Sequence, residues 1–245
     1  MSGRLKGRVA LITGASRGIG AAAARRLAAE GAQVVLLARG EGALAEQQDA
    51  ITASGGRATI RPLDLLALDQ VDALGPSLAA RFGGLDILVA AAATLGPLTP
   101  LGHLGAEDWE RVLALNLTAQ WRLLRTLDPL LRRAPAGRAI FVADAVGERP
   151  RAYWGAYAVA KAGLQALARC WAEETRKTPL KVNLIDPGPV KTRLRAEAYP
   201  GEDATALKAP EAVAGAFLAL AAPEFSASGQ LFRWDDPALV QPSLA

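Results

Sequence analysis

Short apolar runs alternate with longer helix-patterned stretches along this chain, and this alternation limits its fold more than any other feature. The apolar runs are continuous, as in the strands of a parallel sheet that helices cover on both faces. A repeated strand-helix order gives a doubly wound α/β sheet. Strands are predicted at residues 9–12, 34–38, 58–60, 87–89, 139–142, 182–185 and 231–232. Helices are predicted at residues 18–30, 42–53, 68–82, 106–133, 154–177 and 210–221.

The chain is predicted to form one domain. Its 245 residues are 51% hydrophobic and 21% charged, which suits a globular α/β domain with a full core. No linker or repeat divides it, so residues 1–245 should form a single Rossmann-type domain with about seven parallel strands. Two longer loops, 91–105 and 186–209, follow strand ends where such sheets bind ligands. The second is rich in proline, glycine and charge, and is the predicted substrate loop.

Several functional classes do not fit this sequence. The formal net charge of +4 contains no block of like charges, so no nucleic-acid partner is expected. Cys170 is the only cysteine, which excludes an internal disulfide. His103 is the only histidine, which excludes a His-rich metal site, and no metal is expected. The first residues lack the apolar core of a signal peptide, and no apolar run could span a bilayer. We therefore expect a cytoplasmic protein with no membrane partner.

A glycine-rich turn follows the first predicted strand. Gly14 permits a tight turn, while Gly18 and Gly20 let the backbone approach a pyrophosphate and let the next helix pack on the sheet. The N-terminus of that helix offers N–H groups and a partial positive charge to an anion. The residues predicted to bind a dinucleotide here are Gly14, Ser16, Arg17, Gly18, Ile19 and Gly20. A turn that uses glycine for structure alone is the alternative.

Arg39 ends the second predicted strand, where an NAD enzyme usually places an acid that holds the ribose 2′-hydroxyl. Arg17 can approach the same region, and two guanidinium groups suit a 2′-phosphate, so NADP is predicted in preference to NAD. Both arginines could instead face solvent, with Glu41 neutralising one of them. Asp64, followed by Leu65, comes after the third strand and could contact the adenine or cap a helix.

Tyr157 and Lys161 are four residues apart, so they should face the same side of one helix. A free phenol has a pKa of about 10, and a nearby ammonium favours the phenolate and lowers that pKa. Tyr157 could then give a proton to a carbonyl oxygen as hydride arrives, or take one from an alcohol in reverse. Lys161 could also reach the ribose hydroxyls of the dinucleotide. Taken alone, the pair could equally be an ordinary aromatic and a charged residue on a helix.

With these motifs together, the chain resembles the short-chain dehydrogenase/reductase family over essentially its whole length. The resemblance rests on the glycine turn at 13–20, on Tyr157 and Lys161 after Trp-Gly-Ala at 154–156, and on Asp-Pro-Gly-Pro-Val-Lys-Thr at 186–192. It implies an oxidoreductase that acts on a small carbonyl or alcohol substrate. It also implies pairing of subunits into a homodimer or homotetramer.

The resemblance implies roles for further residues. Asn116 matches the family asparagine that holds a water in the proton relay, although a helix-interior amide could simply bond to backbone. The segment 186–192 matches the one at the nicotinamide, where the backbone of Val190 and the hydroxyl of Thr192 would lie near the carboxamide. The cofactor positions implied there are Pro187, Gly188, Val190 and Thr192.

One departure from the family pattern concerns the catalytic serine. That serine normally lies thirteen residues before the tyrosine, and Asp144 occupies its position here with no neighbouring serine or threonine. The serine hydroxyl stabilises developing negative charge, and losing such a donor costs about a hundredfold or more in rate. An ionised Asp144 would repel the nascent alkoxide and raise the pKa of the tyrosine. A protonated Asp144 could still donate a hydrogen bond.

The second departure is a run of four alanines at 90–93, where the family has Asn-Asn-Ala-Gly. Ala90 and Ala91 are expected at the cofactor but lack the amides that brace the central sheet. Ala93 adds a Cβ that could crowd the ribose, and it would not be tolerated if this residue needed a positive φ.

Two hypotheses follow. In the first, the chain is a working NADP-dependent oxidoreductase in which Tyr157 is the acid/base, Lys161 tunes it and Asn116 orders a water. Asp144 is then a protonated donor or a spectator. In the second, it is a nucleotide-binding protein with little or no turnover, because Asp144 and the alanine run weaken the site.

Overall fold

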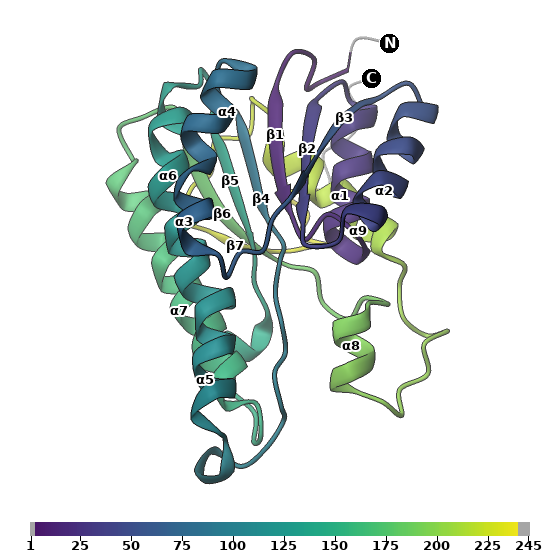
Figure 1. The fold of residues 1–245 in the computed structure, drawn as a ribbon, viewed down its shortest axis with the longest axis vertical. Coiled ribbons are helices and arrows are strands. Elements are labelled where there is room, and N and C mark those ends of the chain that lie inside the picture. The colour runs from purple at the N-terminus through teal and green to yellow at the C-terminus, as the bar shows by residue number, and fades with distance from the viewer. Residues whose placement is uncertain (1–2, 240–245) are drawn as a thin grey trace.

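Seven parallel strands form one sheet in the computed structural model, which describes residues 3–239 (Figure 1). They are β1 (Val9–Thr13), β2 (Gln33–Ala38), β3 (Arg57–Pro62), β4 (Ile87–Ala90), β5 (Arg138–Val142), β6 (Lys181–Asp186) and β7 (Leu231–Arg233). Their order is β3-β2-β1-β4-β5-β6-β7, and in the register Leu11 of β1 lies between Val35 of β2 and Leu88 of β4. The doubly wound, Rossmann-type α/β fold with seven parallel strands is confirmed.

Helices cover both faces of this sheet (Figure 1). One face carries α1 (Gly18–Ala29), α2 (Glu41–Ala53) and α9 (Pro210–Ala221). The other carries α3 (Leu68–Asp72), α4 (Leu74–Phe82), α6 (Ala119–Arg133) and α7 (Gly155–Glu174). The remaining α-helices are α5 (Ala106–Leu113), which packs on α7, and α8 (Arg193–Ala198), which lies beyond the carboxyl ends of the strands. Within residues 3–239, no helix has both the length and the hydrophobicity that crossing a membrane requires.

The strands are apolar on both sides because each face of the sheet is buried. In β1, Ala10 and Ile12 belong to the core under α1 and α9, while Leu11 belongs to the core under α6 and α7. All three side chains are fully buried. Burying an aliphatic side chain contributes about 1.5–3 kcal/mol, so a polar residue at any of these positions would cost stability. This two-sided burial explains the continuous apolar runs.

The predicted helix at 68–82 is in fact two helices, α3 and α4, so the prediction of one continuous helix was wrong. Pro76 has no N–H to donate to the carbonyl of Asp72, four residues earlier. Thr126 of α6 replaces the missing bond: its hydroxyl donates to the Asp72 carbonyl at 2.6 Å and accepts from the Gly75 N–H at 3.1 Å. The break therefore ties α3 and α4 to α6.

The predicted helix at 106–133 contains a π-helical turn, η2 (Ala114–Thr118), between α5 and α6. Asn116 lies in this turn and is 1% exposed. Turns of this kind often occur at functional sites. In this wider turn, the Asn116 side chain lies against the loop that follows β4, where it bonds to Thr94.

Residues 186–209, expected as a loop, contain the short helix α8. Thr192 caps it by accepting the Arg195 N–H at 3.1 Å. The two ends of this segment are joined by a bridge between Val190 and Lys208. The other predicted helices and strands end within three residues of the observed ends.

The strand order creates a crevice at the carboxyl ends of β1 and β4. The chain leaves β1 through α1 towards β2 and β3, and then crosses back to form β4 on the other side of β1. The connections after β1 and β4 therefore diverge, and the space between them is where open α/β sheets bind ligands.

Candidate active site

A cavity of about 670 Å³ lies at this crevice. Its walls come from the turn after β1, the ends of β2 and β4, the loop after β5, α7, and residues 187–199. Most of the predicted site residues line it. They are Gly14, Ser16, Arg17, Gly18, Ile19, Gly20, Arg39, Asp64, Leu65, Ala91, Asp144, Tyr157, Lys161, Pro187, Gly188, Val190 and Thr192. Asn116 and Ala90 are buried and do not line the cavity.

The turn between β1 and α1 brings backbone close to the cavity. Gly14 and Gly18 have φ values of +67° and +58°, a region that favours glycine. A Cβ on Gly20 would lie 2.4 Å from the Gly14 carbonyl oxygen, so α1 can start this close to β1 only with glycine there. Among the described residues, no side chain caps α1, and the N–H groups of its first turn remain available to an anion.

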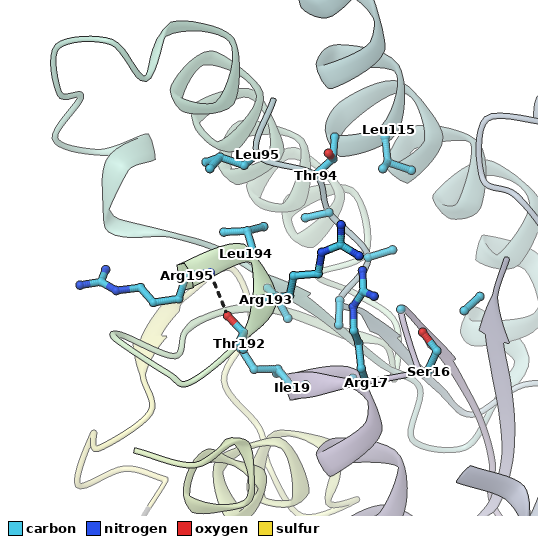
Figure 2. Close-up of a pocket in the computed structure, with 18 of the residues that line it drawn as sticks. Ser16, Arg17, Ile19, Thr94, Leu95, Leu115, Thr192, Arg193, Leu194 and Arg195 are labelled. Atoms are coloured by element: carbon cyan, nitrogen blue, oxygen red, sulfur yellow. Dashed lines mark hydrogen bonds between the residues drawn. The ribbon is translucent and has the colours of Figure 1, made fainter. Parts of the chain in front are cut away.

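Arginines bring positive charge to the cavity wall. Arg17, Arg39 and Arg111 all line the cavity and are exposed, and none forms an ion pair within residues 3–239. Figure 2 shows Arg17 from the glycine turn and Arg193 from α8 reaching into the same part of the cavity. Arg193 also pairs with Glu197, at 2.7 Å. Sequence reasoning found Arg17 and Arg39 but missed Arg111 and Arg193.

Two predicted cofactor residues also form local hydrogen bonds. The Oδ1 atom of Asp64 accepts the Leu66 N–H at 3.0 Å in the loop before α3. The N-cap of α3 is Ala67 and no side chain caps this helix, so the alternative that Asp64 caps a helix is wrong. The Thr192 hydroxyl accepts the Arg195 N–H at the start of α8. Both side chains still line the cavity, so their contacts with adenine and with the carboxamide remain predictions.

Tyr157 and Lys161 lie at the inner end of the cavity. They are 4% and 3% exposed, and the Lys161 Nζ lies 5.6 Å from the centroid of the Tyr157 ring. This Nζ donates to the Val142 carbonyl at 2.7 Å. Burial lowers the pKa of Lys161 to about 8, even though Asp144 and Asp186 oppose the change. The lysine is therefore still mainly a cation at neutral pH, beside the phenol.

Asp144 accepts a hydrogen bond from the proton donor of the site. Its Oδ1 accepts the Val146 N–H at 2.9 Å, and its Oδ2 accepts the Tyr157 hydroxyl at 3.2 Å. Burial, followed by the charge of Asp144 and this hydrogen bond, raises the pKa of Tyr157 well above its usual value. The expectation that Lys161 lowers this pKa is wrong for the chain in this state, because burial and the neighbouring carboxylate outweigh the ammonium.

Buried polar side chains brace the loop after β4. Asn116 Nδ2 donates to the Thr94 carbonyl at 2.7 Å, and its Oδ1 accepts the Thr94 N–H at 2.9 Å. This is the backbone bonding that the sequence left as an alternative, and the relay water stays a prediction. The Thr13 hydroxyl oxygen accepts the N–H groups of Ala91 and Ala92 at 3.1 and 3.2 Å. These contacts brace a loop that lacks the family amides.

The alanine run does not strain the backbone. Among the described residues other than glycine, only Tyr153 has a positive φ. Ala93 therefore does not need the conformation that would have excluded an alanine, and this residue lines the cavity.

An apolar wall closes the cavity near Tyr157. Its side chains come from the loop after β4, the start of α7 and the region of α8; they are Leu95, Trp154, Leu194, Ala198 and Tyr199. The Trp154 ring packs against Tyr157 at 5.9 Å and against Tyr199 at 5.6 Å between centroids. Figure 2 shows Leu95 and Leu194 at the same end of the cavity. Sequence reasoning missed the α8 residues, although Thr192 followed by helix-forming residues was a signal for a capped helix.

Comparison with known proteins gives a consistent result. The model of the short chain dehydrogenase family matches residues 8–203. The uncharacterized oxidoreductase YciK of Escherichia coli (strain K12) is 36% identical over 212 residues, which is 84% of this chain and 82% of YciK. A structure described as a short chain dehydrogenase from Pseudomonas syringae is 40% identical, with a TM-score of 0.93 over 96% of this chain and 97% of the other. One from Shigella flexneri 2a strain 301, complexed with NADP, is 33% identical, with a TM-score of 0.91 over 96% and 99% of the two chains.

Proposed function

The chain belongs to the short-chain dehydrogenase/reductase family of oxidoreductases, and from this premise we propose that it interconverts a carbonyl and an alcohol by hydride transfer with NADP. The observation that carries the proposal is the Tyr157–Lys161 pair, buried at the inner end of a cavity that begins at the glycine turn. A phenol that can give or take a proton beside a dinucleotide site fits this reaction.

The choice of NADP over NAD rests on charge. Arg17 and Arg39 are unpaired within the described chain and line the cavity where the ribose 2′-phosphate would lie. The glycine turn and the uncapped start of α1 suit the pyrophosphate. The related Shigella flexneri protein was crystallised with NADP, which supports the same choice here. Bound NADPH would supply the hydride.

In the reductive direction, Tyr157 would give its proton to the carbonyl oxygen. Its hydroxyl must first turn from Asp144 towards the substrate, so Asp144 competes with the substrate for this proton donor. Lys161 would stabilise the resulting phenolate and reach the ribose hydroxyls. The wall formed by residues 187–199 would hold the substrate, as part of the substrate loop 186–209. Pairing of subunits into a homodimer or homotetramer belongs to the same proposal.

A second candidate function is nucleotide binding with little or no turnover. The observation that favours it is the hydrogen bond from Tyr157 to Asp144, which occupies the proton donor and places an acceptor where the family has a serine hydroxyl. Losing one donor to the developing oxyanion typically costs about 10²–10³ in rate. Under this alternative, wild-type turnover of carbonyl compounds would be negligible and Asp144→Ser would restore it.

The experiment that tests the main proposal measures NADPH oxidation with a panel of aldehydes and ketones. We expect Tyr157→Phe to lower kcat by about 10²–10⁴, because it removes the general acid, while the Kd for NADPH, measured by cofactor fluorescence, stays unchanged. Tyr153→Phe is the matched control, since Tyr153 is 59% exposed and does not line the cavity. Full turnover in Tyr157→Phe would contradict the assignment.

A further inference from the structure

The reacting end of the cavity presents a hydrogen-bond acceptor where the family has a donor. Asp144 lines the cavity and places a carboxylate beside the Tyr157 hydroxyl. Lys161 is the ammonium at this end of the cavity, and its Nζ already donates to the Val142 carbonyl. Asp186, at the end of β6, does not line the cavity, and its Oδ1 accepts the Gly188 N–H at 2.9 Å.

This charge arrangement opposes carbonyl reduction. Hydride addition to a carbonyl places negative charge on the oxygen, which a neighbouring carboxylate repels. The Asp144 oxygens accept hydrogen bonds from Val146 and Tyr157, so in this arrangement they act as acceptors and not as donors. A serine at this position would donate instead.

The same arrangement favours a carbon–nitrogen double bond. An imine is reactive towards hydride once it is protonated, and its N–H⁺ is both a donor and a cation. A carboxylate at hydrogen-bond distance stabilises this charged form and raises the pKa of the bound imine. The donor that Asp144 lacks is then supplied by the substrate itself.

The surrounding wall fits an apolar ring. Leu95, Trp154, Leu194, Ala198 and Tyr199 enclose the space next to Tyr157. Such a wall would hold the hydrocarbon part of a substrate while its polar atom faces the carboxylate of Asp144.

We propose that this site prefers a protonated imine of an apolar, cyclic compound, whose N–H⁺ donates to Asp144 while the imine carbon faces the nicotinamide. The proposal rests on the function proposed above and names its substrate class. Tyr157 becomes a positioning residue for this substrate, because its hydrogen bond orients the Asp144 carboxylate.

One hydride and two protons convert the imine to an ammonium. The imine takes one proton from solvent and binds as the cation. Hydride from NADPH forms a new C–H bond at the imine carbon, and the electron pair of the C=N π bond moves to nitrogen. The products are a secondary amine and NADP⁺. The amine then gains the second proton from solvent and leaves as an ammonium.

The first test compares kcat/KM for NADPH oxidation with 3,4-dihydroisoquinoline and with 1-tetralone. Because the imine and the ketone differ in intrinsic reactivity, the imine-to-ketone ratio of kcat/KM for the wild type is divided by the same ratio for Asp144→Ser. The difference in intrinsic reactivity then cancels. We expect the wild-type imine-to-ketone ratio to exceed the Asp144→Ser ratio by about a hundredfold, since the variant exchanges an acceptor for a donor. Glu148→Gln is the control that should leave the ratio unchanged, because Glu148 is a nearby exposed carboxylate outside the cavity.

Tyr157→Phe separates the two reactions. The variant should abolish ketone reduction, because that reaction needs the proton of Tyr157. It should lower imine reduction by about tenfold or less, because that reaction needs only the position of Asp144. Asp144→Asn should lower imine reduction strongly, because this variant keeps the size of the side chain and removes its charge.

The second test needs no turnover. Isothermal titration compares the binding of 1,2,3,4-tetrahydroisoquinoline, a cyclic ammonium, and of 1-tetralol, a neutral alcohol, to the wild-type NADP⁺ complex. The ammonium should bind about tenfold or more tightly, and Asp144→Asn should remove that preference.

The outcomes distinguish the two proposals. Equal or weaker binding of the ammonium, or an imine-to-ketone ratio that Asp144→Ser leaves unchanged, would overturn the preference for imines while carbonyl reduction stands. Reduction of neither compound by any variant would overturn both proposals.

Discussion

Asp144 changes what Tyr157 can do without moving it from the cavity. The phenol remains buried beside the lysine, as the helical spacing indicated, but its proton is directed at a carboxylate. In the proposal for imines, the acceptor oxygen of Asp144 decides which double bond this chain prefers to reduce. The departure of this site from the family pattern is therefore concentrated in one residue, Asp144.

The ionisation of Tyr157 gives a direct prediction. In an ultraviolet titration of tyrosine, Tyr157 should ionise above the usual range of a phenol, because burial and Asp144 raise its pKa. Asp144→Ser should lower this late transition, although burial keeps it above the usual value. The folded state holds this proton after an unfolded chain has lost it, so Tyr157 contributes stability that falls as pH rises above about 10.

Tyr157→Phe is the control for that titration, and it should remove the late transition. If Tyr157 instead ionised below the usual range of a phenol, as a group dominated by the Lys161 ammonium would, the arrangement with Asp144 would be contradicted.

The sequence predicted which residues line the cavity in most cases, but it did not predict their hydrogen-bond partners. Motifs with fixed spacing, such as the glycine turn and the Tyr157–Lys161 pair, predict position because each follows a strand end or a helical turn. The acceptor role of Asp144 depends on a contact across thirteen residues, and the bonding of Asn116 depends on a π-helical turn. Neither contact has a local sequence signal, so protonated and ionised states of Asp144 could not be separated beforehand.

At the scale of elements, the proposed cofactor site requires α1 to start against β1. Gly20→Ala should lower both the unfolding free energy, by about 1–3 kcal/mol, and the affinity for NADPH, because the added Cβ would lie 2.4 Å from the Gly14 carbonyl oxygen. Urea unfolding and a fluorescence titration with NADPH measure the two effects. A variant with wild-type values would show that this close contact is unimportant.

Gly42→Ala is the matched control for that prediction. Gly42 lies in the first turn of α2, where an added Cβ would have no atom within 4 Å and where φ is not positive. Alanine there should therefore raise stability by no more than about 0.5–1 kcal/mol, the value for a helix interior, and leave NADPH binding unchanged.

Elements were predictable where periodicity was strong and uncertain where tertiary contacts decide. The seven strands and α9 follow from apolar runs and from Pro210 at a helix start. The break between α3 and α4 needs Thr126 of another helix to complete it, and α8 is a short helix with little apolar surface. These features depend on partners distant in sequence.

At the scale of the whole molecule, the cavity joins the two halves of the sheet. Arg17 and Arg39 lie on the β1–β2 side, while Asp144 and Tyr157 lie on the β5 side and on α7. A ligand that spans the cavity would contact both halves and bind only the folded chain, so it should stabilise the entire fold.

Thermal unfolding with nucleotide measures that linkage. NADPH at a hundred times its Kd should stabilise the fold by about 2.7 kcal/mol, which raises the Tm by about 5–10 °C. At the same concentration NADH should raise it less, because the 2′-phosphate is missing. Arg39→Ala should reduce the difference between the Tm shifts with NADPH and with NADH. Arg61→Ala should leave that difference unchanged, because Arg61 is an exposed arginine on β3 outside the cavity. Equal shifts for both nucleotides would contradict the preference for NADP.

The most direct measurement of the central claim is a crystal structure of the chain with NADPH. The account predicts the pyrophosphate at the start of α1, the 2′-phosphate between Arg17 and Arg39, and the nicotinamide ring facing the Tyr157 hydroxyl and the Asp144 carboxylate. A nicotinamide bound elsewhere, or a Tyr157 hydroxyl turned away from the ring, would contradict it.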